Sequence, residues 1–94
     1  MTASLSDAKR ALERVFPGGF DGCVTFHIED LGILTLDSRG VHLGARRADT
    51  ILRADARTFA AILSGRKNPM QLYLKNGLKI EGDLKIAMQL ARQL

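Results

Sequence analysis

The chain has 94 residues, a net charge of +4 and a single cysteine, which is enough material for one small domain with one hydrophobic core. The lone Cys23 excludes an internal disulfide, and no apolar run approaches the roughly 20 residues that a membrane-spanning helix needs. The first residues, Met1 to Leu5, lack a basic stretch followed by an apolar block. We therefore expect a single domain over residues 1–94, no secretory signal and a cytoplasmic location.

The first predicted element is an amphipathic helix over residues 4–16, where apolar residues recur at helical spacing. Either Ser4 or Ser6 is suited to cap its start, and Pro17-Gly18-Gly19 is expected to end it. The apolar residues of this pattern are Leu5, Ala8, Leu12 and Val15.

Three short strands are predicted to follow. Residues 23–29 alternate between the apolar Val24, Phe26 and Ile28 and other side chains, the period of two that is typical of a strand. Turn-like residues separate this segment from residues 33–37 and those from residues 41–43. Short strands joined by tight turns predict an antiparallel meander.

A fourth strand is predicted over residues 49–54, and Asp55 directly after it is suited to cap a helix that ends at Gly65. Asn68 is then placed to cap a second, short helix. Pro69 falls in the first turn of that helix, where a missing N–H group has no cost.

The remaining residues predict one more strand and one more helix. Asn76-Gly77 ends the short helix, residues 78–81 form the fifth strand, and Asp83 caps a terminal helix with a wide apolar stripe. Because two helices separate the fourth and fifth strands, we expect these strands to lie parallel through a right-handed crossover. The predicted fold class is α+β, with about five strands in a mixed sheet, an antiparallel meander plus crossover strands, covered on one face by helices.

Several of these turn signals and apolar anchors recur in a known order. They are Ala48-Asp49-Thr50-Ile51, Phe59, Gly65-Arg66, Asn68-Pro69, Leu78-Lys79-Ile80, Gly82 and Ala87-Met88. This order resembles the sterol carrier protein 2-like lipid-transfer domains over residues 19 to 94. In that family a strand and an Asp-capped helix precede Gly-Lys/Arg-x-Asn-Pro, a short apolar helix, Gly-x-Leu-Lys-Ile-x-Gly and a terminal amphipathic helix.

The resemblance implies an open sheet with helices on one face and an apolar tunnel between them. Such a tunnel holds a sterol, a fatty acyl chain, a phospholipid or a related lipid. The chain has one N-terminal helix where eukaryotic members often have two, and it ends in Arg92-Gln93-Leu94 rather than in a Ser-Lys-Leu-type peroxisomal address. It therefore looks more like the short prokaryotic members, in which a sterol is often not the natural ligand.

The short helix and the terminal helix are expected to form the lipid-contacting wall. The short helix is apolar nearly all round, more than one core face requires, and Met70 and Met88 are adaptable side chains. Plain core packing is an alternative interpretation of the apolar residues in the preceding helix. The predicted lipid-binding residues are Phe59, Ile62, Leu63, Met70, Leu72, Tyr73, Leu74, Leu84, Ala87 and Met88.

The positive charge is concentrated in the second half of the chain. Residues 1–45 hold 4 Lys or Arg against 6 Asp or Glu, whereas residues 46–94 hold 10 against 4. A solvated surface explains this excess, and it also suits transient docking on an anionic membrane surface. The candidate membrane-docking residues are Arg46, Arg47, Arg53, Arg57, Arg66 and Lys67.

The polar residues form no recognisable reactive site. His27 and His42 are not at metal-ligand spacing with Cys23, and adjacent carboxylates at the turns are explained by helix capping. We expect no catalysis, no metal and no cofactor. A nucleic-acid partner is not expected either, because there is no helix-turn-helix pattern and the few aromatic residues form no stacking platform.

Two hypotheses of function remain. The first is non-enzymatic binding or transfer of a hydrophobic lipid, whether sterol-like, fatty acyl, phospholipid or isoprenoid. The alternative is an accessory factor in which the apolar groove and the terminal stripe bind a partner protein of a lipid- or quinone-modifying complex, or a second copy of the chain in a homodimer.

Overall fold

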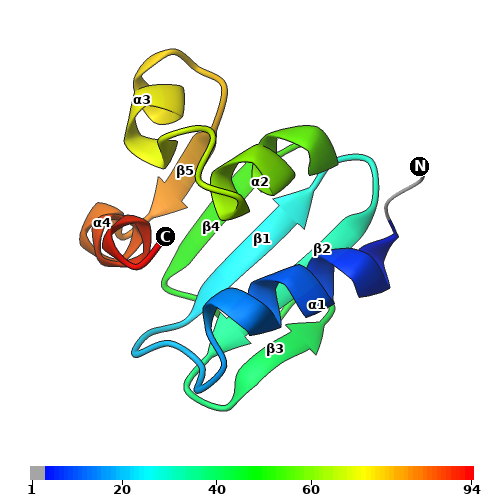
Figure 1. Cartoon of the computed structure of the whole chain (residues 1–94). Coiled ribbons are helices and arrows are strands. Elements are labelled where there is room, and N and C mark those ends of the chain that lie inside the picture. The colour runs from blue at the N-terminus through cyan, green and yellow to red at the C-terminus, as the bar shows by residue number, and fades with distance from the viewer. Residues whose placement is uncertain (1–3) are drawn as a thin grey trace.

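A computed structural model describes residues 4–94, so Met1 to Ala3, where the prediction about a secretory signal begins, lie outside the described residues. The elements are α1 (Leu5–Val15), β1 (Val24–Ile28), β2 (Gly32–Asp37), β3 (Gly40–Leu43), β4 (Thr50–Ala54), α2 (Ala56–Leu63), α3 (Pro69–Leu74), β5 (Lys79–Gly82) and α4 (Leu84–Arg92) (Figure 1). The predicted order of helices and strands along the chain is therefore confirmed. Each helix in the described part of the chain falls short of what a bilayer crossing requires in length and apolar character.

The strands form one mixed sheet in the order β3-β2-β1-β4-β5. β1, β2 and β3 make the predicted antiparallel meander, while β4 lies on the other side of β1 and runs parallel to it. The helices gather on one face of this sheet (Figure 1). The predicted α+β fold class, with a mixed sheet covered on one face, is therefore confirmed.

The expected parallel pairing of the fourth and fifth strands is wrong. β4 and β5 are antiparallel, with Thr50 opposite Gly82 and Arg53 opposite Lys79. A single crossover helix would return the chain to the start of β4. Here α2 carries the chain back along the sheet, and the segment through α3 returns it to the end at which β4 finished (Figure 1). β5 therefore begins beside the end of β4 and runs the opposite way.

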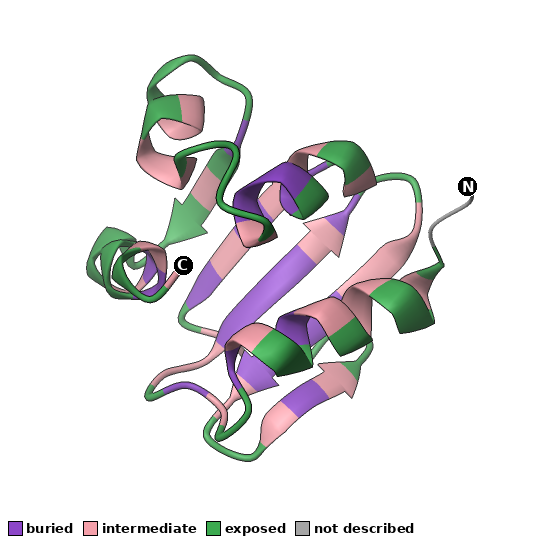
Figure 2. Ribbon diagram, in the orientation of Figure 1, coloured by how far each residue is buried: buried purple, intermediate pink, exposed green. Residues whose placement is uncertain are grey.

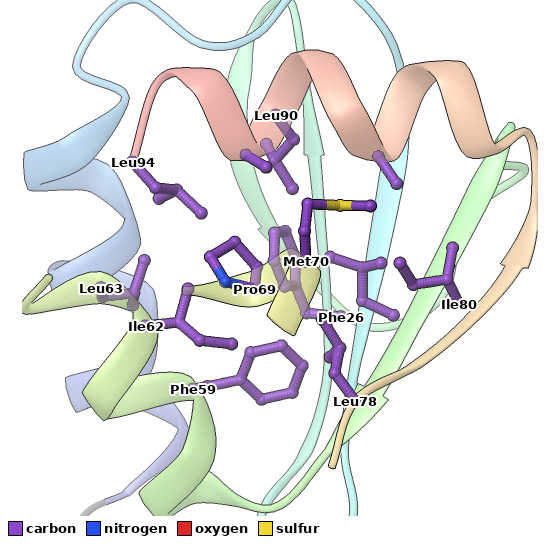
Figure 3. A pocket seen from close by; sticks show the side chains of 13 residues that line it. Phe26, Phe59, Ile62, Leu63, Pro69, Met70, Leu78, Ile80, Leu90 and Leu94 are labelled. Atoms are coloured by element: carbon purple, nitrogen blue, oxygen red, sulfur yellow. The ribbon is translucent and has the colours of Figure 1, made fainter. Parts of the chain in front are cut away.

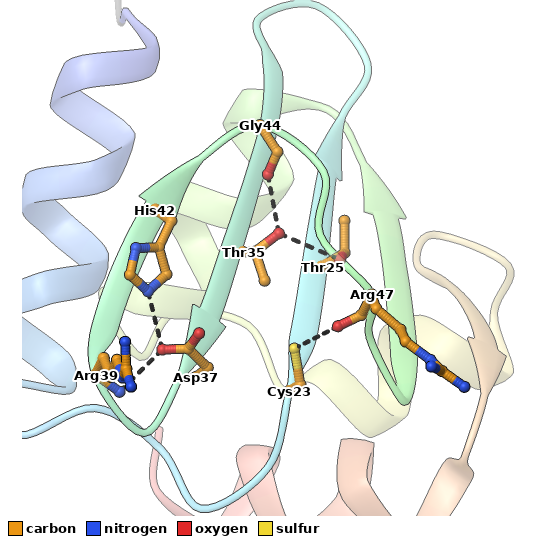
Figure 4. Close-up of polar contacts among 8 residues, drawn as sticks. All are labelled: Cys23, Thr25, Thr35, Asp37, Arg39, His42, Gly44 and Arg47. Carbon is orange, nitrogen blue, oxygen red and sulfur yellow. Dashed lines mark hydrogen bonds and ion pairs between the residues drawn. The ribbon is translucent and has the colours of Figure 1, made fainter.

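The face of the sheet opposite the helices is crossed by residues 44–49, which connect β3 to β4. The Thr35 hydroxyl donates to the carbonyl oxygen of Gly44 at 2.9 Å, and the Cys23 thiol donates to that of Arg47 at 2.9 Å (Figure 4). This cover buries Thr25 and Thr35. Burial raises the pKa of the Cys23 thiol, and nearby carboxylates raise it further, so the thiol is protonated and acts as a structural donor.

The first half of the chain packs tightly. Ser4 and Asp7 form a capping box, in which the Ser4 hydroxyl accepts from the Asp7 amide at 3.2 Å and the Asp7 carboxylate accepts from the Ser4 amide at 3.1 Å. Of the two serines considered from the sequence, Ser4 is therefore the cap. Beyond the helix, Phe16 and Phe20 are both buried and meet edge to face with ring centroids 5.8 Å apart.

The helices of the second half begin at the predicted caps. The Asp55 carboxylate accepts a hydrogen bond from the Thr58 amide at 2.8 Å. Hydrogen bonding to the side chain and the backbone of Thr58 holds the pKa of Asp55 below its ordinary value. Asp30, in the β1–β2 turn, accepts from the Ala56 amide at 2.9 Å and fixes the same helix end to the sheet. The caps of α3 and α4 are Asn68 and Asp83.

Candidate lipid-binding site

An apolar cavity lies between the sheet and the last three helices, and we call it the central cavity. Its floor is a row of side chains that project from three neighbouring strands: Phe26 of β1 is in register with Leu52 of β4, which is in register with Ile80 of β5. All 13 lining side chains are apolar (Figure 3). The cavity can therefore offer shape and hydrophobic contact to a ligand but no hydrogen bond from a side chain.

The walls of the central cavity come from α2, α3 and α4. Residues at the start of α3 face one turn of α4, whose Ala87, Leu90 and Ala91 line the cavity together with Leu94 beyond the helix. The predicted lipid-binding residues that line it are Phe59, Ile62, Leu63, Met70 and Ala87. Phe59 and Ile62 also belong to the buried core, so core packing and cavity lining are both roles of the same side chains.

The other predicted lipid-binding residues lie away from the central cavity. Leu72 packs against the edge of the core, and Tyr73 is half-buried. Leu74 is 78% exposed, and Leu84 and Met88 are 40% and 41% exposed. For the residues of α3 the reason is that this helix has only 6 residues and no buried one, so that only its first turn reaches the cavity, whereas Leu84 and Met88 lie on the exposed side of α4.

Sequence reasoning missed the floor of the cavity and parts of its walls. The strand residues Phe26, Leu52 and Ile80 were not among the predicted lipid-binding residues, although alternation along a strand indicates which of its residues share one face. Their strand order could not be read from this pattern. The remaining lining residues that were not predicted are Pro69, Leu78, Leu90, Ala91 and Leu94.

The central cavity is small in this structure. Its volume is about 20 Å³, which is room for roughly one water molecule. A hydrocarbon chain therefore enters only if the walls separate. Among the walls, α3 has no buried residue, and α4 exposes two large apolar side chains.

A second hollow, the α1–α2 groove, lies on the other side of α2. Its volume is about 190 Å³, and small side chains such as Ala8, Ala11 and Ala60 leave this space open. Phe59 and Leu63 line both the groove and the central cavity. The Phe59 ring is held edge to face against Phe26 at 5.6 Å between ring centroids, so Phe59 is part of the partition between the two spaces.

The candidate membrane-docking cations are spread over several elements. Arg46 and Arg47 lie in the segment that crosses the far face of the sheet, and Arg57 lies near the start of α2. Arg66 and Lys67 lie in the connection between α2 and α3, and Lys67 lines a hollow that shares Pro69 and Leu94 with the central cavity. The six cations thus form no single patch.

Arg53 belongs to a chain of polar contacts on the sheet face opposite the helices. Its guanidinium donates to the Glu81 carboxylate and, at 2.9 Å, to Nδ1 of His27. Since Nδ1 accepts this hydrogen bond, the neutral imidazole carries its proton on Nε2. Arg53 and His27 therefore tie β4 to β5 and β1, and their positions are explained by sheet structure.

The other histidine takes part in a similar contact on the β2–β3 hairpin. His42 Nε2 lies 2.9 Å from the Asp37 carboxylate, which also accepts from the Arg39 amide at 2.9 Å (Figure 4). These hydrogen bonds lower the pKa of Asp37. Within residues 4–94, no three His, Cys, Asp or Glu side chains come together as metal ligands would.

Comparison with known proteins places this geometry in a family. The sequence model of the SCP-2 sterol transfer family matches residues 6–94. No curated protein sequence matches significantly. The apo form of sterol carrier protein 2 from Yarrowia lipolytica is similar in structure, with a TM-score of 0.70 and 20% identity over 95% of this chain and 77% of that one.

Two further solved structures share the fold. Palmitated SCP2L2 from Aedes aegypti has a TM-score of 0.65 and 18% identity, over 94% of this chain and 87% of that one. A structure described as UbiJ-SCP2 ubiquinone synthesis protein has a TM-score of 0.56 and 19% identity, over 90% of this chain and 71% of that one. At these identities the structural matches show a common fold.

Proposed function

The chain belongs to the SCP-2 sterol transfer family, and on this premise we propose that it is a carrier that binds one lipid molecule in its central cavity. Family members in general bind or transfer lipids and are not enzymes. We propose the same non-enzymatic role here, performed by one domain that spans residues 1–94. The presence of a single cysteine, Cys23, is consistent with a reducing cytoplasmic environment.

The observation that carries this proposal is the uniformly apolar lining of the central cavity. Each buried methylene of a ligand contributes roughly 0.8 kcal/mol. A chain of about ten methylenes therefore gains about 8 kcal/mol, from which the costs of association and of opening the cavity are subtracted. The result is moderate affinity, which suits a carrier because the lipid must also be released.

The lining favours a ligand with a long hydrocarbon chain over one recognised by specific polar contacts. No lining side chain of the central cavity can hydrogen-bond a hydroxyl or an amide. One relative of this fold is described as palmitated. A fatty acyl chain is accordingly the ligand that we propose first.

We propose that the central cavity opens between α3 and α4. Met70 is unbranched and lies in the first turn of α3, where it can change rotamer without moving the sheet. Ala91 on α4 presents only a methyl group. We propose that α3 and α4 separate to admit the chain while the sheet remains fixed.

The test of the carrier role is native mass spectrometry of the freshly purified protein, followed by lipid extraction and mass analysis. We expect one lipid molecule per protein chain. Titration with a fluorescent fatty acid is expected to show saturable binding with one site. A protein that contains no lipid and binds none of a series of fatty acids, sterols and phospholipids would contradict the proposal.

A cavity-filling variant locates the site. Ala87 is 4% exposed and lines the central cavity, so Ala87→Phe places a ring where the hydrocarbon chain is proposed to lie. We expect at least a tenfold loss of affinity for the fluorescent fatty acid, because the ring must be displaced. Ala45→Phe, in the exposed segment before β4, is the matched control. Equal affinity of both variants, with circular dichroism showing both folded, would place the ligand elsewhere.

A second candidate function is that of an accessory subunit or homodimer in a lipid- or quinone-modifying complex. Two observations favour it: a fold relative is described as a ubiquinone synthesis protein, and α3 and α4 expose Leu74, Leu84 and Met88. Sedimentation analysis separates the two candidates. A lipid-loaded monomer supports the carrier, whereas a stable lipid-free dimer that dissociates in Met88→Glu supports the accessory role.

Transient docking on an anionic membrane accompanies the carrier proposal, since Lys67 lines a hollow beside the central cavity and Arg66 precedes it in the chain. Co-sedimentation with vesicles that contain 0 or about 30% anionic lipid tests this step. We expect binding that increases with anionic lipid and falls with salt. Binding insensitive to both would contradict membrane docking without affecting the lipid-binding site.

A further inference from the structure

Two open hollows adjoin the central cavity where α3 meets α4. The first has a volume of about 230 Å³ and is lined by Asn68, Met70, Met88, Ala91 and Arg92. Met70 and Ala91 also line the central cavity. The wall between this hollow and the cavity is therefore made in part by a flexible side chain and a methyl group.

The second hollow has a volume of about 160 Å³ and lies on the other side of Asn68 and Ala91, which line both hollows. Lys67 lines this second hollow, together with Pro69 and Leu94, which also line the central cavity. Lys67 and Arg92 thus line two neighbouring hollows that meet at Asn68 and Ala91, and we call Lys67, Asn68 and Arg92 the cationic rim.

The side chains that line the two hollows carry only positive charge. Lys67 and Arg92 are exposed, and neither forms an ion pair within residues 4–94. No Asp or Glu of the described chain lines either hollow. Asn68 uses its side-chain oxygen to cap α3, accepting from the Met70 amide at 2.9 Å, which leaves the amide nitrogen as a further donor.

The α1–α2 groove on the opposite side has the reverse charge. Asp7 is the charged residue among its lining side chains, and the capping box with Ser4 holds that carboxylate in place. An anion at this groove would be repelled by Asp7, whereas an anion at the cationic rim is attracted by two cations. The two openings therefore differ in the sign of the headgroup that they accept.

An anionic headgroup cannot follow its hydrocarbon chain into the central cavity, because an ion in apolar surroundings loses its hydration without compensation. It has to remain at an opening, and the charges select which one. We propose that the protein binds single-chain lipids with an anionic headgroup, carboxylate or phosphate, oriented with the headgroup on Lys67 and Arg92 and the chain directed towards Phe59. This inference rests on the carrier role and adds the charge and orientation of the ligand.

The test compares three probes with the same chain: dodecanoate, dodecyl phosphate and dodecanol. Each is titrated calorimetrically below its micelle concentration, at pH 8 and about 0.1 M salt, without vesicles, so that membrane docking makes no contribution. We expect the anionic probes to bind about fivefold more tightly than dodecanol, as partly exposed ion pairs do. Comparison of the carboxylate with the phosphate then identifies the preferred headgroup.

The variant Lys67→Gln/Arg92→Gln removes the two cations. We expect it to bind all three probes with nearly equal affinity and to keep the wild-type affinity for dodecanol. Lys75→Gln/Lys85→Gln is the control, since it removes the same charge from exposed positions that line none of the hollows described above. This control is expected to keep most of the preference for anions, because distant exposed charges are screened.

The possible failures are distinguishable. If wild-type protein binds dodecanol as tightly as the anions, or if the Lys67→Gln/Arg92→Gln variant keeps the preference, the headgroup site is refuted while the carrier role stands. If none of the three probes binds, the headgroup site is refuted, and the carrier role is then decided by the lipid extraction and by the series of fatty acids, sterols and phospholipids described above.

Discussion

Two regions of the molecule differ in how deeply their residues are buried. In the first region, α1 with β1–β3, core residues such as Val24, Leu34 and Leu36 have at most 1% of their surface exposed. In the second, α2–α4 with β5, α3 has no buried residue and Leu74 is 78% exposed. Figure 2 shows the contrast as buried strands beside the largely exposed ribbons of α3 and α4.

This difference teaches where binding is feasible. A closed core supplies stability but cannot admit a ligand, because close-packed side chains leave no space and resist displacement. A loosely packed wall contributes less stability and moves at lower cost. Stability and ligand binding are therefore located at different positions along the sheet, and the central cavity lies on the loosely packed side.

The largest expected effect comes from truncating equally buried leucines in the two regions. Leu36 is 0% and Leu90 is 1% exposed, but only Leu90 lines the central cavity. We expect Leu36→Ala to lower the free energy of unfolding by about 4 kcal/mol and Leu90→Ala by about 2 kcal/mol, because the cost of a cavity depends on how far its surroundings can collapse. Urea unfolding measures both. Equal losses would contradict the idea that α4 is the more adaptable wall.

A smaller effect is expected when the partition between the central cavity and the α1–α2 groove is removed. Phe59→Ala should lower the free energy of unfolding by about 3 kcal/mol and merge the central cavity with the α1–α2 groove. We therefore expect the fatty acid chain length that binds most tightly to increase. Phe20→Ala is the control, since Phe20 is also buried, at 3% exposed, but lies in the closed region. Displacement assays across a chain-length series check this, and an unchanged optimum in Phe59→Ala would show that Phe59 is no partition.

The smallest effect concerns the N-terminal cap of α2, the helix that lines both the central cavity and the α1–α2 groove. Asp55→Ala should cost about 1 kcal/mol at neutral pH. Because hydrogen bonds from Thr58 lower the pKa of Asp55 in the folded protein, the contribution of its charge is complete above the unfolded value of about 3.9 and is lost as pH falls through the lower folded value.

The variant Asp55→Asn isolates this titration, because asparagine also caps helices but stays neutral. Urea unfolding between pH 7 and pH 2 should show the wild type losing more stability than Asp55→Asn below about pH 4. Parallel curves for the two proteins over this range would mean that the charge of Asp55 contributes nothing to the cap.

Much of the local structure was predictable, because it depends on neighbours in the chain. Asp55, Asn68 and Asp83 cap the helices that they were expected to cap, since a short polar side chain satisfies free N–H groups two or three residues later. The meander of β1–β3 followed from alternation and tight turns for the same reason. The family resemblance was also readable, because it consists of these turn signals in order.

The site was predictable only in part. Phe59, Ile62, Leu63, Met70 and Ala87 line the central cavity as expected, whereas Leu74, Leu84 and Met88 are exposed. An apolar helix indicates that some of its residues are covered, but the direction of each side chain depends on how far the helix lies from its neighbours. α3 is too short to bring more than its first turn to the cavity.

The sequence by itself determined the order of helices and strands, their caps and the membership of a lipid-carrier family, since these depend on local chemistry along the chain. Only the tertiary structure decided that β5 runs antiparallel to β4, that Phe26, Leu52 and Ile80 form one row, and that Lys67 and Arg92 line neighbouring hollows. These relations join residues from separate elements, and they are set by the packing of those elements against one another, which no local pattern encodes.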